Sequence, residues 1–251
     1  MLSQYYKPPS SKRINYLKFS YFSIIIVALS SFYLFASTTT SLADAQNATN
    51  STEISTLFET ADTLYSQKKY DEAIKYYDKI LAINASEIDA LNPKGLSLWG
   101  LHKYNESLSY FDQILSINSS NVKALNNKGL ALLALQKNEE AIQYFDQVLS
   151  INASDVYAIN NKAEALAEMG KNEEAFSVIE KTAIDNPNDE YLQSTIAFIL
   201  ANMGKDNEAR VYYEKALKIN SNLTKVLYEK ELDVFNKVMG NTTTLPQQRQ
   251  Q

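Results

Sequence analysis

Apolar residues recur along most of this chain at the spacing of an α-helix. Leu91, Leu98 and Leu101 are separated by steps of seven and three residues, and the same steps recur 34 residues later. A second apolar stripe runs from Ile74 to Leu81. Steps of three, four and seven residues place side chains on one face of a helix, whereas a strand alternates every second residue. The pattern therefore predicts a series of amphipathic helices and no sheet.

The whole pattern repeats every 34 residues. Counted from their first residue, five units begin at Ile54, Ile88, Val122, Val156 and Glu190. Position 16 is always Lys, position 19 always Glu and position 31 always Asn, while position 8 is always Ala or Gly and position 24 is Tyr, Phe or Ile. A small residue facing a large one at fixed offsets predicts two closely packed helices in each unit. Because one helical hairpin cannot bury both of its apolar stripes, neighbouring units must stack.

These units resemble the tetratricopeptide repeat family, whose unit is a helix, a tight turn and an antiparallel helix. The resemblance covers residues 54–223 and is strongest in the segments 124–135 and 139–146. It implies an all-α, right-handed superhelical solenoid of about five helix-turn-helix repeats. Two features depart from the family: Pro is found near a unit's end only at Pro187, and Gln193 stands where a large apolar residue is usual.

The flanks of the repeats predict further segments. Residues 224–239 form an amphipathic pattern that predicts a C-terminal capping helix, and Gly240 is a plausible end for it. Residues 240–251 are rich in Thr and Gln and are expected to be a disordered tail.

The N-terminus predicts membrane targeting. Residues 1–18 are basic, and residues 19–36 contain no charge. Such a segment is a signal-peptide core or a transmembrane helix, with its basic flank in the cytoplasm. In the linker 37–53, Ala43-Asp44-Ala45 fits a signal-peptidase site and predicts cleavage after Ala45. The apolar segment also just reaches the length of a membrane span, so cleaved export and a retained anchor both fit. In either case the repeats are expected outside the cytoplasm.

Eight Asn-x-Ser/Thr sequons fit an exterior location. They begin at Asn47, Asn50, Asn84, Asn105, Asn118, Asn152, Asn222 and Asn241. Three of them stand at position 31 of successive units, in the turn between repeats. One interpretation is N-glycosylation of an exported protein. The other is that Asn ends a helix well and Ser follows by chance.

Composition and charge limit the chemistry. The chain has no Cys, one His and a net charge of −5, and the part after residue 45 holds 20 basic and 28 acidic residues. An acidic body without basic runs disfavours nucleic acid. His102 has no second His or Cys to share a metal, and the Glu139-Glu140 and Glu173-Glu174 pairs suit helix starts. We therefore expect no enzyme activity, cofactor, metal site or small-molecule substrate.

The resemblance also implies where a partner would bind. In the family the first helices line a concave groove, with side chains from about positions 2, 5, 6 and 9 pointing into it. Here those positions give a predicted partner-binding set: Asn92, Lys123, Asn126, Asn127, Tyr157, Asn160, Asn161, Glu164 and Tyr191. Amides offer a donor and an acceptor to an extended peptide backbone, and Tyr adds apolar contact with a polar tip. Equally, these Asn side chains could fill the groove or bridge adjacent repeats.

Three functional hypotheses follow. The first is a membrane-anchored or exported scaffold that binds a protein or peptide in its groove, with the membrane contacted through residues 19–36 if they are not cleaved. The second is a structural, glycosylated component of the cell envelope. The third and weakest is an accessory subunit of an envelope enzyme. Replacement of Asn126, Asn127, Asn160 and Asn161 by Ala separates the first from the second.

Overall fold

The computed structural model describes residues 51–225 and 229–240 of the chain. The predicted leader, the cleavage site after Ala45, the sequons at Asn47, Asn50 and Asn241, and all of the tail except Gly240 lie outside these residues. The chain divides into two units, 1–56 and 57–251. In the first unit the described residues, 51–56, are helical.

Helices joined by short turns make up the described part of the second unit, beginning with helical residues 57–66. The helices that follow are α2 (Tyr70–Ile83), α3 (Ile88–Gly100), α4 (Tyr104–Ile117), α5 (Val122–Ala134), α6 (Asn138–Ile151), α7 (Val156–Glu168), α8 (Asn172–Asp185), α9 (Glu190–Asn202), α10 (Asp206–Ile219) and α11 (Glu229–Met239). Between 51 and 240, the described residues contain no strand.

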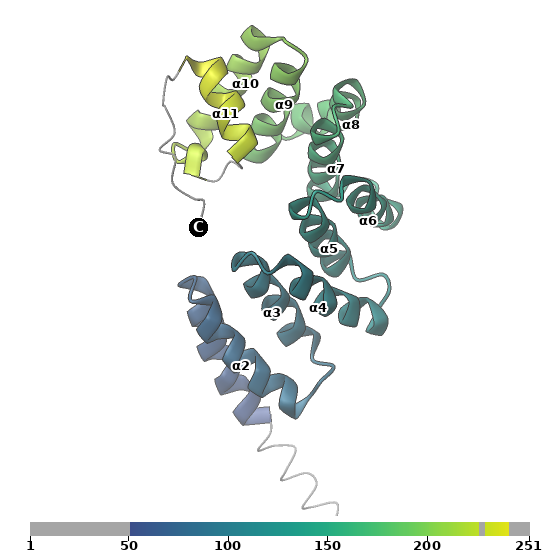
Figure 1. Ribbon diagram of the computed structural model, residues 1–251, viewed down its shortest axis with the longest axis vertical. Helices are drawn as coiled ribbons and strands as arrows, with labels where there is room; N and C mark the ends of the chain where they lie inside the picture. The colour runs from purple at the N-terminus through teal and green to yellow at the C-terminus, as the bar shows by residue number, and fades with distance from the viewer. Residues whose placement is uncertain (1–50, 226–228, 241–251) are drawn as a thin grey trace, which may run out of the picture. The chain divides into compact units, whose positions relative to one another are not determined.

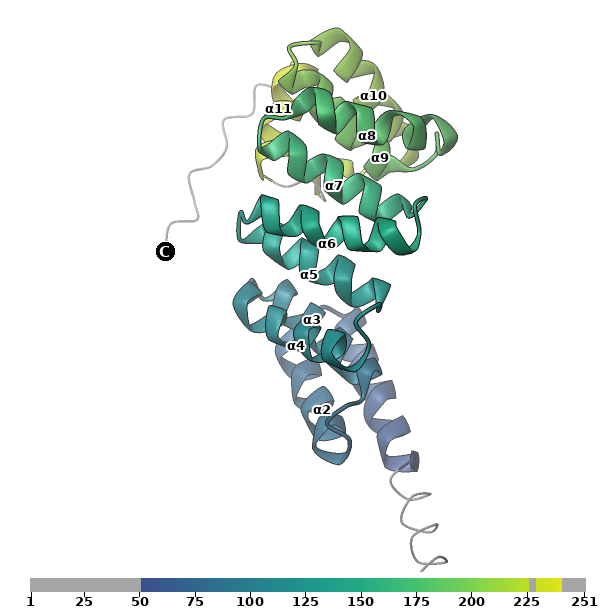
Figure 2. The same ribbon diagram turned by 90° about the vertical axis from the view of Figure 1, so that its right-hand side faces the viewer.

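Each helix from α2 to α10 packs against the next one in the chain, and the helices stack in chain order (Figure 1, Figure 2). The first helices of successive repeats also contact one another, α3 with α5, α5 with α7, and α7 with α9. They therefore lie on the inner side of the stack. α11 packs on both α9 and α10 at the C-terminal end. The predicted all-helical solenoid of helix pairs with a terminal helix is confirmed.

The turn inside each repeat depends on one left-handed residue. Position 15 of the five units has φ near +60° at Lys68, His102 and Gln136, and φ of 76° at Gly170 and Gly204. In this region a Cβ atom crowds the following carbonyl, which costs about 1–2 kcal/mol for residues other than Gly. The first three repeats therefore contain a strained turn that the last two avoid.

Small residues let the two helices of a repeat approach closely. A Cβ placed on Gly95 would lie 2.7 Å from Cε1 of Phe111, and one on Gly129 would lie 2.4 Å from Cε1 of Phe145. Both rings are fully buried. Carbon atoms in ordinary contact are about 3.5–4.0 Å apart, so only Gly fits at these two positions without a shift of the ring. The small-facing-large pattern in the sequence therefore corresponds to direct contact.

A ladder of ion pairs links one repeat to the next. Lys94 pairs with Asp78, Lys128 with Asp112, and the Nζ of Lys162 lies 2.6 Å from the Oδ1 of Asp146. The first two lysines also lie over tyrosine rings of their own repeats, at 4.3 and 4.5 Å from the ring centroids. Each of these two ammonium groups is thus held between a carboxylate and an aromatic face, which is a favourable setting for a partly buried cation.

The C-terminal end differs in detail from the predicted helix 224–239. Leu223–Lys225 forms a 3₁₀ turn, and α11 covers Glu229–Met239. The Oδ1 of Asn220 accepts a hydrogen bond from the N–H of Asn222 at 2.9 Å, which favours a turn at this point. Within 51–225 and 229–240 we find no helix that is both long and apolar enough to cross a bilayer.

Gln193 occupies an apolar position of the family without disrupting the core. Its side chain is buried, and its Nε2 donates a hydrogen bond to the carbonyl oxygen of Ala183 at 3.2 Å. α9 is buried along its length from Leu192 to Ala201 because α7, α8, α10 and α11 all pack against it. A buried amide is tolerated when it has a hydrogen-bond partner.

Candidate functional site

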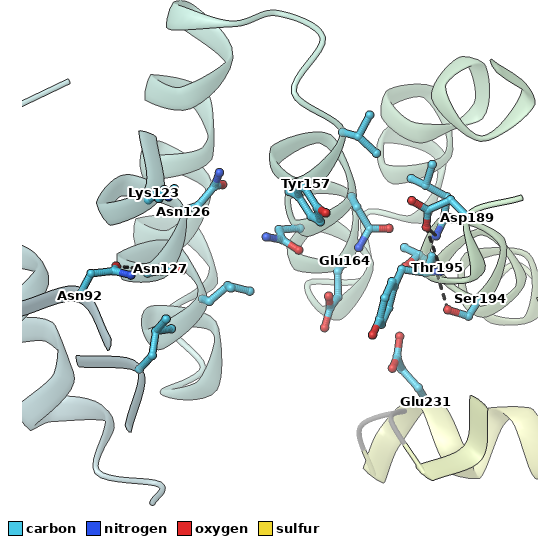
Figure 3. A pocket seen from close by; sticks show the side chains of 17 residues that line it. Asn92, Lys123, Asn126, Asn127, Tyr157, Glu164, Asp189, Ser194, Thr195 and Glu231 are labelled. Atoms are coloured by element: carbon cyan, nitrogen blue, oxygen red, sulfur yellow. Dashed lines mark hydrogen bonds between the residues drawn. The ribbon is translucent and has the colours of Figure 1, made fainter. Parts of the chain in front are cut away.

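A cavity of about 660 Å³ opens on the inner side of the stack, between the first helices and α11 (Figure 3). Its walls come from α3, α5, α7, the start of α9 and one residue of α11. All nine residues of the predicted partner-binding set line it: Asn92, Lys123, Asn126, Asn127, Tyr157, Asn160, Asn161, Glu164 and Tyr191. The structure therefore brings the whole set together around one space. That a partner binds there stays a prediction.

Side-chain caps fix where three of the helices that line the cavity begin, namely α5, α7 and α9. Asn121 caps α5, with its Oδ1 accepting from the N–H of Ala124 at 3.0 Å, and Asp155 caps α7 through the N–H of Ala158 at 2.9 Å. Asp189 caps α9 and also lines the cavity. Such caps satisfy helix N–H groups that otherwise lack partners. The first turn of each helix, which carries position 2, thus has a defined orientation towards the cavity.

The asparagine side chains of the groove divide into two groups. Asn127, at position 6, donates from Nδ2 to the Oδ1 of Asn92, at position 5 of the preceding repeat, with a distance of 2.8 Å. The Oδ1 atoms of Asn126 and Asn160, also at position 5, are buried and have no hydrogen-bond partner. One pair therefore bridges repeats, as the alternative interpretation expects. The other two asparagines line the cavity, but their side-chain oxygens are buried and unsatisfied.

Carboxylates gather at the C-terminal end of the cavity. Glu164 of α7 and Glu231 of α11 point into the same space (Figure 3). Burial, followed by the charges of Glu231 and Glu168, raises the pKa of the Glu164 carboxyl well above its ordinary value. Glu231 is itself buried, at 8% exposure. This end of the cavity therefore favours a proton or another cation close to Glu164.

Two tyrosines provide exposed aromatic surface beside these carboxylates. Tyr157 is 73% exposed and Tyr191 is 51% exposed, whereas most other large apolar side chains of the described residues are buried or half-buried. Both lie at position 2 of their repeats and line the cavity. An exposed ring next to a concave polar surface is suited to contact with a partner.

Further lining residues lie outside the predicted set. They are Leu96, Leu130, Val156, Asp189, Leu192, Ser194, Thr195 and Glu231. Four of them stand at position 5, 6 or 9 of their repeats: Leu96, Leu130, Ser194 and Thr195. The repeat positions that predicted the other groove residues could therefore have predicted these four as well. Glu231 comes from outside the repeats, and only the packing of α11 on α9 places it here.

The sequons within the described residues are on the surface. Asn84, Asn105, Asn118, Asn152 and Asn222 are all exposed. At the three helix ends, the Oδ1 of Asn84, Asn118 and Asn152 accepts from the N–H two residues later, at 3.1, 3.1 and 3.2 Å. These asparagines thus have a structural role in the turn between repeats. The amide nitrogen to which a glycan would attach takes no part in that bond.

The remaining polar candidates, His102 and the Glu139-Glu140 and Glu173-Glu174 pairs, lie outside the residues that line the cavity. His102 is exposed in the turn between α3 and α4, and its Nδ1 lies 2.7 Å from the Oη of Tyr104. Over 51–225 and 229–240, no cluster of three or more His, Cys, Asp or Glu side chains has an arrangement that fits a metal ion.

Solved structures with a similar fold are themselves repeat proteins. TTC0263, a thermophilic TPR protein of Thermus thermophilus, is 18% identical with a TM-score of 0.61, and the match covers 74% of this chain and 97% of that one. MamA of Desulfovibrio magneticus RS-1 is 16% identical with a TM-score of 0.58, covering 68% and 96%. YrrB, described as a TPR protein with an unusual peptide-binding site, is 20% identical with a TM-score of 0.51, covering 72% and 90%. At these identities the likeness concerns the fold alone.

Family models agree on the repeats. Models described as tetratricopeptide repeat match residues 55–86 and 92–156, and one described as Psidin, N-terminal TPR repeats region, matches residues 130–232. No curated protein matches the chain in sequence. Since the three models together match most of the segment from 55 to 232, the chain belongs to the tetratricopeptide repeat family and is a protein-interaction scaffold.

Proposed function

We propose that this chain is a membrane-anchored or exported scaffold that captures a peptide or protein segment in the cavity between its first helices. The observation that carries the proposal is the gathering of all nine predicted groove residues around one space of about 660 Å³. A cavity with a few polar groups among apolar ones is the usual form of a binding site. Asn126 and Asn160 line the cavity, and rotation of their side chains would turn the unsatisfied oxygens towards a partner with N–H groups to donate.

An extended peptide is the class of partner that fits this surface best. The groove crosses α3, α5, α7 and α9, so polar groups recur along it at the spacing of the repeats. Amide side chains at several points along a groove can bond a peptide backbone whatever the sequence of the peptide. The structural likeness to YrrB, described as having a peptide-binding site, supports this choice.

An extracytoplasmic location is part of the proposal. The uncharged segment 19–36 behind a basic N-terminus supports export or anchoring, and the exposed sequons are compatible with glycosylation. In this arrangement the groove meets its partner in the cell envelope or outside the cell.

Affinity capture from the envelope fraction tests the proposed groove. The full chain in mild detergent is used as bait, beside a variant with Asn126, Asn127, Asn160 and Asn161 changed to Ala. A control variant changes four exposed amides away from the cavity: Gln67, Gln113, Gln143 and Gln147. We expect the groove variant to lose a partner that the wild type and the control retain. Equal capture by all three proteins would contradict the proposal.

The exposed sequons favour one second candidate, a structural and glycosylated envelope component. Expression in a host with N-glycosylation, followed by intact mass measurement, tests whether Asn84, Asn118 and Asn152 carry glycans. Replacement of these three residues by Gln should remove the added mass if they do. Glycans at these sites together with unchanged capture by the groove variant would favour the structural role over the scaffold.

A further inference from the structure

Three asparagines of the repeats occupy equivalent turns with the same backbone conformation. Asn84, Asn118 and Asn152 follow the last residues of α2, α4 and α6, and their backbones are extended, with φ between −142° and −137° and ψ between 96° and 99°. Because the helices stack in chain order, these turns form a row along one edge of the stack. None of the three asparagines is among the described residues that line the cavity. The row is therefore a surface separate from the groove.

Each of these turns presents a complete Asn-x-Ser sequon on the surface. The Oδ1 of each Asn accepts from the N–H of the Ser two residues later, so the two residues are held close together. These serines, Ser86, Ser120 and Ser154, are exposed, as are the asparagines. An N-glycan acceptor requires a Ser or Thr at this third position, so the transferring enzyme must reach the Asn amide and the hydroxyl together. Both groups are accessible here on the folded chain.

The fold closes the other two described sequons, although their asparagines are exposed as well. Asn105 lies in the first turn of α4, and the third residue of its sequon, Ser107, is fully buried, with its Oγ donating to the carbonyl oxygen of Tyr104 at 2.8 Å. In the sequon of Asn222 the middle residue, Leu223, is fully buried and begins a 3₁₀ turn. An enzyme can reach all of either sequon only after local unfolding.

The amide nitrogens of the three turn asparagines differ in their hydrogen bonds. The Nδ2 of Asn84 donates to the Oε2 of Glu87 at 3.0 Å. The side chains at the position of Glu87 in the next two repeats cap α5 and α7 instead. In Asn118 and Asn152 the described side-chain hydrogen bonds involve the Oδ1 alone. One N–H of the amide is therefore engaged in Asn84, whereas both are available in Asn118 and Asn152.

An exposed isoleucine precedes two of these asparagines. Ile117 is 48% exposed and Ile151 is 49% exposed, and they are the last residues of α4 and α6. Exposed apolar surface favours unwanted association with other molecules. An N-glycan is bulky and solubilising, so at the next residue it would shield this surface.

We propose that the folded chain is N-glycosylated on this row of turns, at Asn118 and Asn152 first and at Asn84 to a smaller extent, and not at Asn105 or Asn222. This assignment rests on the extracytoplasmic location in the proposed function, and it specifies which sequons are used. In the transfer, the Nδ2 attacks the anomeric carbon of an oligosaccharide carried on a lipid diphosphate. The bond from that carbon to the diphosphate oxygen breaks, the lipid diphosphate leaves with the electron pair, and one Nδ2 proton passes to a base of the transferring enzyme. Because the row lies outside the cavity, the same molecule can carry the sugars and capture a partner.

The rate of modification at each site tests the assignment. The folded full chain in mild detergent is incubated with an oligosaccharyltransferase and its lipid-linked oligosaccharide, and mass spectrometry of proteolytic peptides measures the initial rate at each sequon. Five synthetic peptides, one for each described sequon, give the rate without the fold. Relative to their own peptides, Asn118 and Asn152 should react at least about tenfold faster than Asn105 and Asn222, because the latter two require local unfolding. The rate at Asn84 should lie between these two groups.

Two pairs of variants locate the effect. Ser120→Ala should abolish modification of Asn118, because it removes the required hydroxyl, whereas the control Ser119→Ala keeps the sequon and should leave the rate unchanged. Glu87→Ala should raise the rate at Asn84 towards that at Asn118, because it releases the Nδ2, and it should not change the rate at Asn118. The side chain of Glu87 makes no capping hydrogen bond at the start of α3, so the fold should be retained, which circular dichroism verifies.

Mass spectrometry of the chain isolated from its natural host completes the test. Sugar on Asn118 and Asn152, without sugar on Asn105 or Asn222, is the expected result. Equal relative rates at all five sites of the folded chain, or sugar on all five in the natural protein, would overturn selection by the folded turns. Absence of sugar from all three turns in the natural protein would overturn the modification itself. Peptide capture would still stand in each case, since the four-asparagine variant tests it separately.

Discussion

Replacement of Gly129 by Ala tests the small-facing-large packing inside a repeat. The added Cβ would lie 2.4 Å from Cε1 and 2.7 Å from Cζ of Phe145. Ordinary carbon contacts are about 3.5–4.0 Å, so the ring must move by about 1 Å. Phe145 is fully buried in a cluster with Leu125 and Leu132, so movement of its ring disturbs these neighbours.

The expected loss of stability follows from two opposing effects. Overpacking a well-filled core costs about 1–3 kcal/mol, and a contact this short belongs in the upper part of that range. Ala favours the helix over Gly by about 1 kcal/mol, which offsets part of the cost. We therefore expect Gly129→Ala to lower the free energy of unfolding by about 1–2 kcal/mol.

Urea unfolding followed by far-UV circular dichroism measures the change, with the full chain in mild detergent. The control is the same substitution in a Phe145→Leu background, where the smaller side chain leaves room for the methyl group. There Gly129→Ala should be neutral or stabilising by up to about 1 kcal/mol. The two substitutions should therefore be strongly non-additive, as expected of residues in contact. An equal loss of stability in both backgrounds, or a gain in the wild type, would refute the packing argument.

Two further predictions concern a turn and a titratable group. Gln136→Gly should stabilise the chain by about 0.5–1 kcal/mol, because it removes a Cβ from a left-handed turn, and Gly170→Ala should destabilise it by about 1–2 kcal/mol, because it adds one. Thermal unfolding measures both changes, and shifts of the melting temperature in the same direction would contradict this account of the turn. For Glu164, burial and the charges of Glu231 and Glu168 raise the pKa of the folded state, so the folded chain binds the proton more tightly than the unfolded chain does. The stabilising contribution of Glu164 should thus fall as pH rises from the ordinary pKa of Glu to the raised pKa of the folded state. Glu164→Gln should make the free energy of unfolding depend less on pH over that range. An unchanged pH dependence would contradict the assignment.

The fold followed from the sequence because its signals are periodic and local. Apolar stripes at helical spacing and the small residue at position 8 recur in every unit, so every unit predicts the same packing of two helices. The exception to the family pattern, Gln193, has a local solution in its bond to the carbonyl of Ala183. This hydrogen-bond partner could not be predicted from the sequence, because the carbonyl group of Ala183 lies on the neighbouring helix.

The groove was predictable to the extent that it follows repeat positions. The nine predicted residues line one cavity because first helices face the inner side and present equivalent positions to it. Which amides pair was not predictable: Asn127 bonds Asn92, whereas Asn126 and Asn160 stay unsatisfied, although all belong to similar local sequences. Such pairing depends on how side chains of adjacent repeats meet, which the local sequence of one repeat does not specify.

The position of Glu231 at the cavity could not be predicted from repeat positions, because this residue lies outside the repeats. The sequence predicts a capping helix, but the side of it that faces the cavity depends on how Phe235 and Val238 insert against α9 and α10. The ion-pair ladder joins Lys at position 7 to Asp at position 25 of the preceding repeat, and it was not predicted from the sequence, because only the stacking of repeats brings those positions together. Both features arise from contacts between elements and not from any one element.

Site-specific photo-crosslinking in cells that contain the natural partner tests the central claim most directly. A photoreactive amino acid is placed at Tyr157, which is 73% exposed in the groove, or at Ile184, which is 65% exposed on α8 and does not line the cavity. The two positions are similarly accessible, so the yield reports on where the partner lies. A partner adduct from Tyr157 and none from Ile184 is the predicted result. An adduct from Ile184 alone, or equal yields from both positions, would contradict capture in the groove.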